Sequence, residues 1–314
     1  MKANIVSDNQ SPQKINHFIL TRFNVRLYPK DKNGNDTLTP EWLENRFQLF
    51  ERYTLPSLSA QTCKDFIWII LIDNRTPQVF KDRLNEHKKR CQNIQVIKLM
   101  TDKGNLSTKV FSEVIQNEMK NLYGNDYKDG KVLTTWMDND DALAIDFVER
   151  LQQEAMAQPL KRPTFIAFHY GLQYFTQQNI AVRHRFKNNH FISLIEKMQP
   201  GEFPKTVFGY GTHWYVYTFE DRCDIHQVAN RDKAAWIEVV HKRNVANDIL
   251  PRMYWYRPIS DVHLLEKEFG LDVVLDQHNG RKLFTTILPK ILKVNARHFW
   301  TRALEKSGLR KRRK

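Results

Sequence analysis

The chain has 314 residues, of which 41% are hydrophobic and 12% aromatic, and this composition excludes general disorder because it can bury a substantial core. The formal net charge is +14, but residues 281–314 hold twelve Lys and Arg residues against one acid, Glu305, and so carry +11 of that charge. The remaining +3 on residues 1–280 argues against a nucleic-acid-binding fold, which would place a basic patch on its own surface.

Cysteine usage and hydropathy indicate the compartment. Cys63, Cys91 and Cys223 show no paired spacing, which suits a reducing environment better than a disulfide framework or a zinc site. The N-terminus has no apolar signal segment, and the longest apolar run, residues 66–72, is far shorter than the ~20 residues that span a bilayer. We therefore expect a cytoplasmic protein, with any membrane contact being peripheral.

The N-terminal half alternates strand and helix patterns. Residues 15–20 predict a first strand, and Thr39 and Pro40 have the N-cap and first-turn positions of a helix. Residues 66–72 are a continuous, β-branched apolar run typical of a central parallel strand covered on both faces. The other elements predicted here are a charged helix over 77–91, a strand over 94–99, a helix over 108–122 and a strand over 132–137.

This alternation predicts an α/β fold with a mixed, mainly parallel sheet flanked by helices. The second half changes to strand-like segments at 164–169, 171–175, 180–186 and 207–217, followed by a predicted helix over 233–245. We expect this half to complete one domain over residues 1–280. We also expect it to form the wall of the ligand site that faces an acceptor substrate. Residues 281–314 are expected to form a separate basic, amphipathic helical segment.

The acidic cluster Asp138-Asn139-Asp140-Asp141 follows the predicted strand 132–137 directly, as Asp73-Asn74 follows strand 66–72. Ligands of such sheets gather at the carboxyl ends of strands. One reaction that would use carboxylates at this position is sugar transfer from a nucleotide sugar. It uses a Mg²⁺ or Mn²⁺ ion, held by one or two carboxylates, to neutralise the diphosphate. Asp138 and Asp140 have suitable spacing for the metal and for catalysis. The alternative is a solvated loop or helix cap, and we assign Asp141 to capping a helix that begins near Ala142.

Several motifs resemble a known family. Residues 50–62, FERYTLPSLSAQT, with Phe66-Ile67-Trp68 and Asp73, resemble the start of a GT-A-fold glycosyltransferase. The further matching segments are Thr21-Arg22-Phe23-Asn24, residues 137–142, Asp146-Phe147-Val148 and residues 236–244. Together they are similar to the bacterial putative rhamnosyltransferase family over about residues 15–250.

The resemblance implies a GT-A fold and assigns roles to particular positions. It implies that Asp73 recognises the base or ribose, and that Asp138 and Asp140 hold the ribose and the metal. It also implies that His241 returns from the C-terminal half toward the metal or diphosphate. The chain departs from the commoner two-acid strand end by having Asn74 after Asp73, although an amide can still bond a pyrimidine. The donor sugar implied is rhamnose or another deoxyhexose.

Further donor-binding candidates flank these positions. Thr21, Arg22 and Asn24 follow the first strand, and Arg22 either pairs with a diphosphate or is an ordinary surface residue. His213 lies in a glycine-containing stretch that could form a wall over the donor, or it is a structural histidine. An inverting transferase needs a general base near the acceptor hydroxyl, and the candidates in the right half are catalytic Glu220 and Asp221.

The C-terminal segment has paired apolar residues at helical spacing, interleaved with Lys and Arg, between residues 283 and 304. Five basic residues, 310–314, end the chain. This pattern is typical of a helix at an anionic membrane surface, although Pro289 divides it and a helix packed on the domain would also account for it.

Two rival functions remain beside a metal-dependent glycosyltransferase that moves a sugar from a nucleotide sugar to a glycan or lipid-linked acceptor. A sugar-phosphate nucleotidyltransferase should have a glycine-rich phosphate loop after its first strand, and residues 21–26 contain no glycine. A nucleic-acid-binding protein is supported only by the basic tail. We favour the glycosyltransferase.

Overall fold

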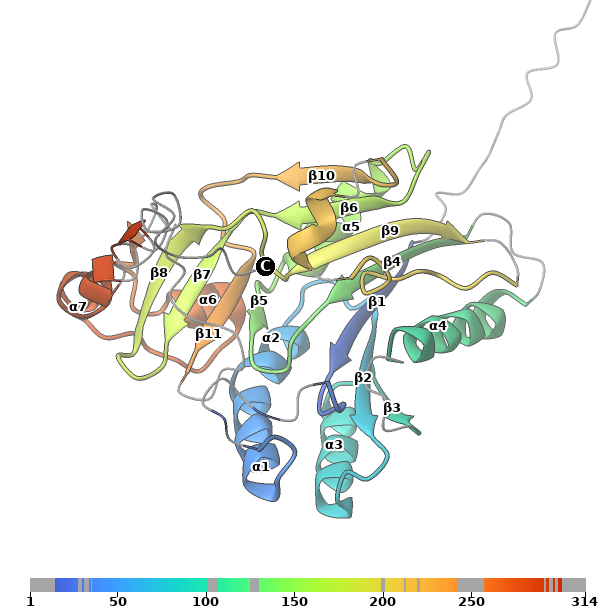
Figure 1. Ribbon diagram of the computed structural model, residues 1–314, viewed down its shortest axis with the longest axis horizontal. Coiled ribbons are helices and arrows are strands. Elements are labelled where there is room, and N and C mark those ends of the chain that lie inside the picture. The colour runs from blue at the N-terminus through green and yellow to red at the C-terminus, as the bar shows by residue number, and fades with distance from the viewer. Residues whose placement is uncertain are drawn as a thin grey trace, which may run out of the picture.

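The computed structural model describes residues 15–27, 30, 34, 36–100, 107–124, 130–198, 201–211, 213–218, 221–241, 257–290, 292, 293, 296, 299 and 300. A seven-stranded sheet has the order β10-β6-β9-β4-β1-β2-β3 (Figure 1). Its strands are β1 (Ile15–Arg22), β2 (Ile67–Asp73), β3 (Ile94–Leu99), β4 (Gly130–Trp136), β6 (Thr164–Phe168), β9 (Ile192–Met198) and β10 (Asp224–Val228).

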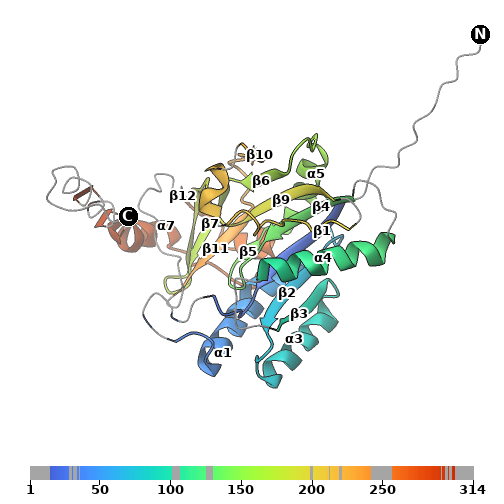
Figure 2. The same ribbon diagram turned by 45° about the vertical axis from the view of Figure 1, so that its right-hand side comes forward.

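The first four of these strands pair in parallel, whereas β9 runs antiparallel between β4 and β6. Helices cover both faces of the parallel part, which is why β2 consists almost entirely of buried apolar residues. Trp68 and Ile70 face the side where α1 and α3 pack, while Ile69 and Leu71 face α4. Figure 2 shows α4 lying across the strands. The mixed, mainly parallel fold predicted from the sequence is confirmed.

The helices have the following bounds: α1 (Pro40–Leu49), α2 (Leu55–Ser59), α3 (Gln78–Arg90), α4 (Ser107–Tyr123), α5 (Phe147–Met156), α6 (Leu264–Phe269) and α7 (Asn279–Lys282). A π-helical turn, Phe50–Thr54, joins α1 to α2, and a second, Leu283–Ile287, follows α7. The predicted N-cap is confirmed, since the backbone N–H of Trp42 donates to Thr39 Oγ1 at 3.2 Å. Across the described ranges, we find no helix of the length and apolarity that crossing a bilayer requires.

A second, five-stranded sheet lies beside the first (Figure 1) and has the order β12-β8-β7-β11-β5. Its strands are β5 (Ala142–Leu143), β7 (Tyr170–Phe175), β8 (Ile180–Arg185), β11 (Trp236–Val240) and β12 (Arg257–Pro258). Strand β11 pairs in parallel with β7 and antiparallel with β5. Residues 137–141 therefore connect the last parallel strand of one sheet to the first strand of the other.

Three local predictions are wrong. The helix predicted over 233–245 is replaced by β11, in which the β-branched residues Ile237 and Val239 are buried and the strand pairs with β5 and β7. Residues 242–250 lie outside the described ranges. The strand predicted over 207–217 is a series of turns followed by a 3-10 helix, His213–Thr218, and Gly211 has φ +84°, which interrupts an extended chain. The helix predicted to begin near Ala142 is β5, and α5 begins five residues later, at Phe147.

The start of the predicted C-terminal segment packs on the second sheet. Leu283 and Ile287 are buried against Phe175, Ile180 and Val182 of β7 and β8. Other apolar side chains farther along are exposed, namely Phe284, Leu292, Phe299 and Trp300. The boundary predicted between residues 280 and 281 stays a prediction, and residues 301–314 lie outside the described ranges.

Candidate active site

The carboxyl ends of three parallel strands meet at one edge of the large sheet. In the register, Leu20 of β1 lies beside Trp136 of β4, and Arg22 lies beside Leu71 of β2. The residues that follow each strand are thereby gathered at this edge. These are Arg22–Asn24 after β1, Asp73-Asn74 at the end of β2 and the acidic cluster Asp138–Asp141 after β4. The sequence predicted this convergence.

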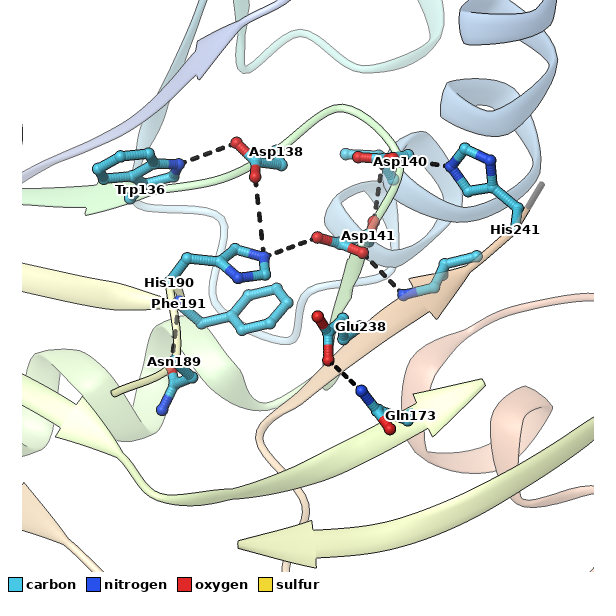
Figure 3. Close-up of polar contacts among 12 residues, drawn as sticks. Trp136, Asp138, Asp140, Asp141, Gln173, Asn189, His190, Phe191, Glu238 and His241 are labelled. Carbon is cyan, nitrogen blue, oxygen red and sulfur yellow. Dashed lines mark hydrogen bonds and ion pairs between the residues drawn. The ribbon is translucent and has the colours of Figure 1, made fainter. Parts of the chain in front are cut away.

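Asp138 is the most accessible carboxylate of the cluster, with 41% of its side chain exposed. Its Oδ1 atom accepts a hydrogen bond from Trp136 Nε1 at 2.8 Å, which fixes the carboxylate. Its Oδ2 atom points to His190, whose Nε2 atom lies 3.8 Å away (Figure 3). Asp138 thus presents a partly open oxygen toward a buried imidazole.

Asp141 is fully buried and its side chain does not cap a helix, contrary to the sequence prediction. Its Oδ1 atom accepts from the backbone N–H of Val239 at 2.8 Å, and its Oδ2 atom lies 2.7 Å from His190 Nε2 (Figure 3). The chain after Asp141 continues as β5 rather than as a helix. The side chain of Asp141 therefore joins the start of β5 to β11 and to the segment just before β9. Helix α5 begins after Asp146, whose side chain makes no capping hydrogen bond.

The loop that carries His190 is held in place from both sides. Asn189 donates to the backbone carbonyl of Phe168 at 3.0 Å, and its Oδ1 accepts from the backbone N–H of Phe191. The ring of Phe191 stacks on Trp236 with centroids 4.9 Å apart. Burial alone lowers the pKa of His190, but the hydrogen bond to Asp141 and the charges of Asp141 and Asp138 outweigh burial and raise it. His190 and Asp141 are thus joined by a short hydrogen bond between two buried side chains.

Asp140, although it lies within the acidic cluster, contacts a different set of side chains. Its Oδ2 atom lies 2.5 Å from Arg46 Nη1 of α1 and 3.0 Å from His241 Nε2, and all three side chains are buried. Burial raises the pKa of a carboxyl, yet the charge of Arg46 and the hydrogen bond from His241 hold the pKa of Asp140 well below its usual range. The predicted approach of His241 to the acidic cluster is therefore observed, and its partner is Asp140.

One group of described residues has the geometry of a metal site. Asp138, Asp141 and His190 each offer one ligand atom, and these atoms all lie within 4.8 Å of one another. Oxygen and nitrogen ligands around a six-coordinate ion at about 2.1 Å lie roughly 3 Å apart, and the distances to His190 Nε2, 2.7 and 3.8 Å, fit that shell. The two carboxylates suit Mg²⁺ or Mn²⁺, and the imidazole favours the transition metal of the two, Mn²⁺. The predicted set of Asp138, Asp140 and His241 shares Asp138 with this group.

A further acid, Glu238 of β11, lies beneath this group (Figure 3). Its Oε2 atom accepts from Gln173 Nε2 at 2.6 Å, and burial raises its pKa. Sequence reasoning quoted Glu238 only as part of a motif and missed His190 altogether, because residues near position 190 carry no local motif. The signal lies in the strand pairing: Thr135 pairs with Ser193, so the antiparallel register extended by three residues brings His190 opposite Asp138.

The predicted donor-binding residues near Asp73 form a hydrogen-bonded network. Asp73 Oδ1 accepts from the backbone N–H of Arg75 at 2.7 Å, and Oδ2 accepts from Arg26 Nε at 3.0 Å. Burial opposes ionisation, but these two arginines lower the pKa of Asp73. Asn24 accepts from the Asp73 backbone and donates to Thr76, which fixes the strand end. The network presents two half-exposed guanidinium groups at this edge.

The remaining donor-binding candidates differ in orientation. Arg22 lies over the rings of Trp136 and Phe208, at 4.8 and 4.4 Å from their centroids, close to the tryptophan that holds Asp138. Thr21 is fully buried and accepts from Trp68 Nε1, so its hydroxyl faces the core. Within the described ranges, the Oδ1 atom of Asn74 is buried and has no hydrogen-bond partner.

The structure does not bring Asp221 to the acidic cluster. Its side chain is exposed, and it precedes β10, whose first residue, Asp224, pairs with Thr164 at the start of β6. Thr164 in turn lies beside Ile195, which pairs with Leu133, so Asp221 sits toward the amino-terminal edge of β4. Glu220 and the side chain of His213 lie outside the described residues, and their roles stay predictions.

Comparison of the sequence with known protein families identifies one family. A family model described as putative rhamnosyl transferase matches residues 21–253, which is more than half of the chain. The chain belongs to this family. The match includes the acidic cluster, His190 and His241. Among curated proteins, none matches the sequence.

Several solved structures have a distant likeness to this chain. Residues 1–349 of Staphylococcus aureus TarS in complex with UDP align with a TM-score of 0.35 and 11% identity, over 72% of this chain and 60% of that one. The same protein with UDP-GlcNAc gives 0.34 and 12%, over 76% and 62%. A nucleoside-diphosphate-sugar pyrophosphorylase from Vibrio cholerae gives 0.33 and 12%, over 68% and 92%. The chain thus spans less than two thirds of the TarS structures.

Proposed function

We propose that this glycosyltransferase moves a sugar, rhamnose or another deoxyhexose, from a nucleotide-sugar donor to a surface polysaccharide or lipid-linked glycan, with Mg²⁺ or Mn²⁺ at the acidic cluster. The observation that supports this most is the meeting of Asp138, Asp141 and His190 at the carboxyl edge of the sheet. Parallel α/β sheets bind their ligands at this edge. The family membership of the chain supports the transfer reaction itself.

The metal site assigns separate tasks to the three aspartates of the cluster. A cation held by Asp138, Asp141 and His190 would neutralise the charge that builds on the diphosphate as the glycosidic bond breaks. Asp140 is already neutralised by Arg46, and we infer that it positions the loop and His241 rather than binding the ion. This assignment replaces Asp140 and His241 with Asp141 and His190 as partners of Asp138.

The nucleotide would be recognised at the neighbouring strand end. Asp73 holds Arg26 and Arg75 in place, and their half-exposed guanidinium groups can bind phosphate oxygens or ribose hydroxyls. The buried Oδ1 atom of Asn74 can accept a hydrogen bond from a base. Together these groups would fix the donor with its diphosphate directed toward Asp138.

The C-terminal segment supports contact with an anionic membrane on the cytoplasmic side. Leu283 and Ile287 anchor its start to the second sheet, while Phe284, Phe299 and Trp300 remain exposed. Residues 281–314 carry a net +11, and each basic residue adds about 1 kcal/mol of attraction to anionic lipid. Cosedimentation with vesicles containing phosphatidylserine, but not with neutral vesicles, is the expected result, and equal sedimentation with both would contradict it.

The proposed donor can be tested by thermal shift. We expect free nucleoside diphosphate, and at least one nucleotide sugar, to raise the melting temperature in the presence of Mn²⁺ and less so without it. A ligand at 100 times its dissociation constant should add about 2.7 kcal/mol of stability. The His190→Gln variant should lose the Mn²⁺-dependent part. Absence of stabilisation by every nucleotide tested would refute the proposal.

A further inference from the structure

A groove of about 930 Å³ runs along one face of α1. Its floor is formed by side chains at helical spacing on α1, including Glu41, Asn45 and Gln48. One wall comes from the start of α3, with Val79 and Phe80, and the other from the turn between β7 and β8, with Thr176 and Gln177. Three elements far apart in sequence therefore line one open space.

The groove adjoins the active site through His241. This residue lines the groove, and its Nε2 atom lies 3.0 Å from Asp140 of the acidic cluster. The opposite wall is fixed to the same strand end, because the hydroxyl of Thr176 donates to the carbonyl of Val240. The residues that line the groove do not include Asp73, Asp138 or His190. It therefore borders the catalytic edge without using the residues assigned to the donor.

The chemistry of the lining favours a neutral, hydroxyl-rich ligand. The amides of Asn45, Gln48 and Gln177 can both donate to and accept from hydroxyl groups, and the carboxylate of Glu41 can accept. Val79, of which 67% is exposed, adds an apolar surface for the C–H face of a sugar ring.

The charge of the lining points the same way. Among the described residues of the lining, Glu41 and Glu44 are acidic and Arg52 is basic. Part of the charge of Glu44 is already engaged, since its Oε2 atom accepts from Arg83 at 2.8 Å. A ligand carrying a phosphate or carboxylate would meet no excess of positive charge here. The lining therefore disfavours anionic occupants.

We propose that this groove is the acceptor subsite and that it takes an uncharged saccharide. The role of the groove as an acceptor subsite rests on the proposed function. The binding of a neutral sugar in the groove does not depend on it. The donor and the acceptor must lie next to each other where the glycosidic bond of the donor breaks. His241 lines the groove and contacts Asp140, which lies in the same loop as Asp138 and Asp141. An acceptor in the groove would therefore lie beside the loop that holds the donor's metal.

Saturation-transfer NMR on the full chain tests this proposal with the methyl α-glycosides of glucose, galactose, mannose and rhamnose as probes. Gln48→Trp fills the groove from an exposed position on α1, and Gln153→Trp is a matched substitution at an exposed position on α5, outside the lining. We expect at least one glycoside to bind the unmodified protein and Gln153→Trp, and to bind Gln48→Trp at least 10-fold more weakly. Equal binding to all three proteins, or no binding of any glycoside to the unmodified protein, would overturn the proposal.

A second measurement separates this inference from the proposed function. Thermal stabilisation by nucleoside diphosphate with Mn²⁺ should be the same in the unmodified protein, Gln48→Trp and Gln153→Trp, because the groove does not hold the donor. If glycosides bind in the groove while no nucleotide stabilises any of the three proteins, the proposed function fails and the saccharide site stands. Stronger binding of a sugar phosphate than of its neutral glycoside in the groove would contradict the assigned ligand class.

Discussion

His190 lies opposite Asp138 because β9 runs antiparallel to β4, and its Nε2 atom is 3.8 Å from Asp138 Oδ2. The same nitrogen is 2.7 Å from Asp141. This pairing places an imidazole, rather than only carboxylates, at the carboxyl edge of the sheet. Asp138 is the exposed member of this group, whereas Asp140 forms a separate, buried ion pair with Arg46.

The metal assignment predicts unequal effects of two histidine substitutions. His190→Gln should weaken Mn²⁺ binding about 10-fold or more, because even residues that only support metal ligands cost 10–100-fold. His241→Gln is the matched control and should leave Mn²⁺ affinity within about twofold, since His241 contacts Asp140. Titration calorimetry with Mn²⁺ measures both. A larger loss in His241→Gln would restore the set of Asp138, Asp140 and His241.

The buried pair of Arg46 and Asp140 predicts a large effect on stability. Arg46→Met removes the charge that neutralises Asp140, and leaving one member of such a pair buried costs about 3–5 kcal/mol. Urea denaturation should show this loss in the free energy of unfolding. The double variant Arg46→Met/Asp140→Asn should recover part of it, because no unpaired charge remains. A double variant no more stable than the single one would contradict the ion-pair explanation.

Most of the first sheet could be predicted from the sequence because its signals are local. The apolar run of residues 66–72 and the helical spacing after Pro40 identify elements without tertiary information, and both are observed. The gathering of Asp73 and Asp138 at one edge also follows from parallel strands. These predictions depend only on period and on the general rule for strand ends.

The rest of the site depends on pairing between distant strands, which the sequence does not show. The segment around Trp236 was predicted as a helix because a five-residue strand with four apolar residues cannot be distinguished from a buried helix by period alone. When this segment is taken as a helix, the backbone N–H of Val239 is not available to bind Asp141, and Asp141 is then predicted to cap a helix. His190 depends in the same way on the register of β9.

Two buried histidines predict that stability falls in mild acid. Burial lowers the pKa of His17 and of His184 to about 3, from an unfolded value of about 6.5. Between these values the unfolded chain binds protons that the folded chain excludes, so the stabilisation is complete above pH ~6.5 and is lost as pH decreases. Each histidine contributes a slope of about 1.4 kcal/mol per pH unit.

A variant isolates this contribution from other titrating groups. In His17→Gln the free energy of unfolding, measured in urea between pH 7 and 5, should depend on pH less steeply than in the unmodified protein, by about 1.4 kcal/mol per pH unit below pH ~6. An unchanged slope would show that His17 is protonated in the folded protein.

Close packing of Gly171 against Trp236 predicts a further destabilising substitution. A Cβ atom at position 171 would lie 2.2 Å from the indole ring, which is itself fixed by a hydrogen bond to the carbonyl of Phe168. Gly171→Ala should therefore cost about 1–3 kcal/mol as the ring is displaced. Replacing Trp236 by Phe in the Gly171→Ala protein should recover part of this stability, and thermal unfolding measures both. A neutral Gly171→Ala substitution would contradict the packing described.

The central claim is that the donor's metal binds between Asp138, Asp141 and His190. A crystal structure of the protein with Mn²⁺ and a nucleoside diphosphate, with data collected at the manganese absorption edge, measures this position directly. We predict an anomalous peak within about 2.3 Å of one atom of each of these three side chains, bridged to the diphosphate. A peak beside Asp140 and His241, or a diphosphate bound with no metal at the acidic cluster, would contradict the assignment.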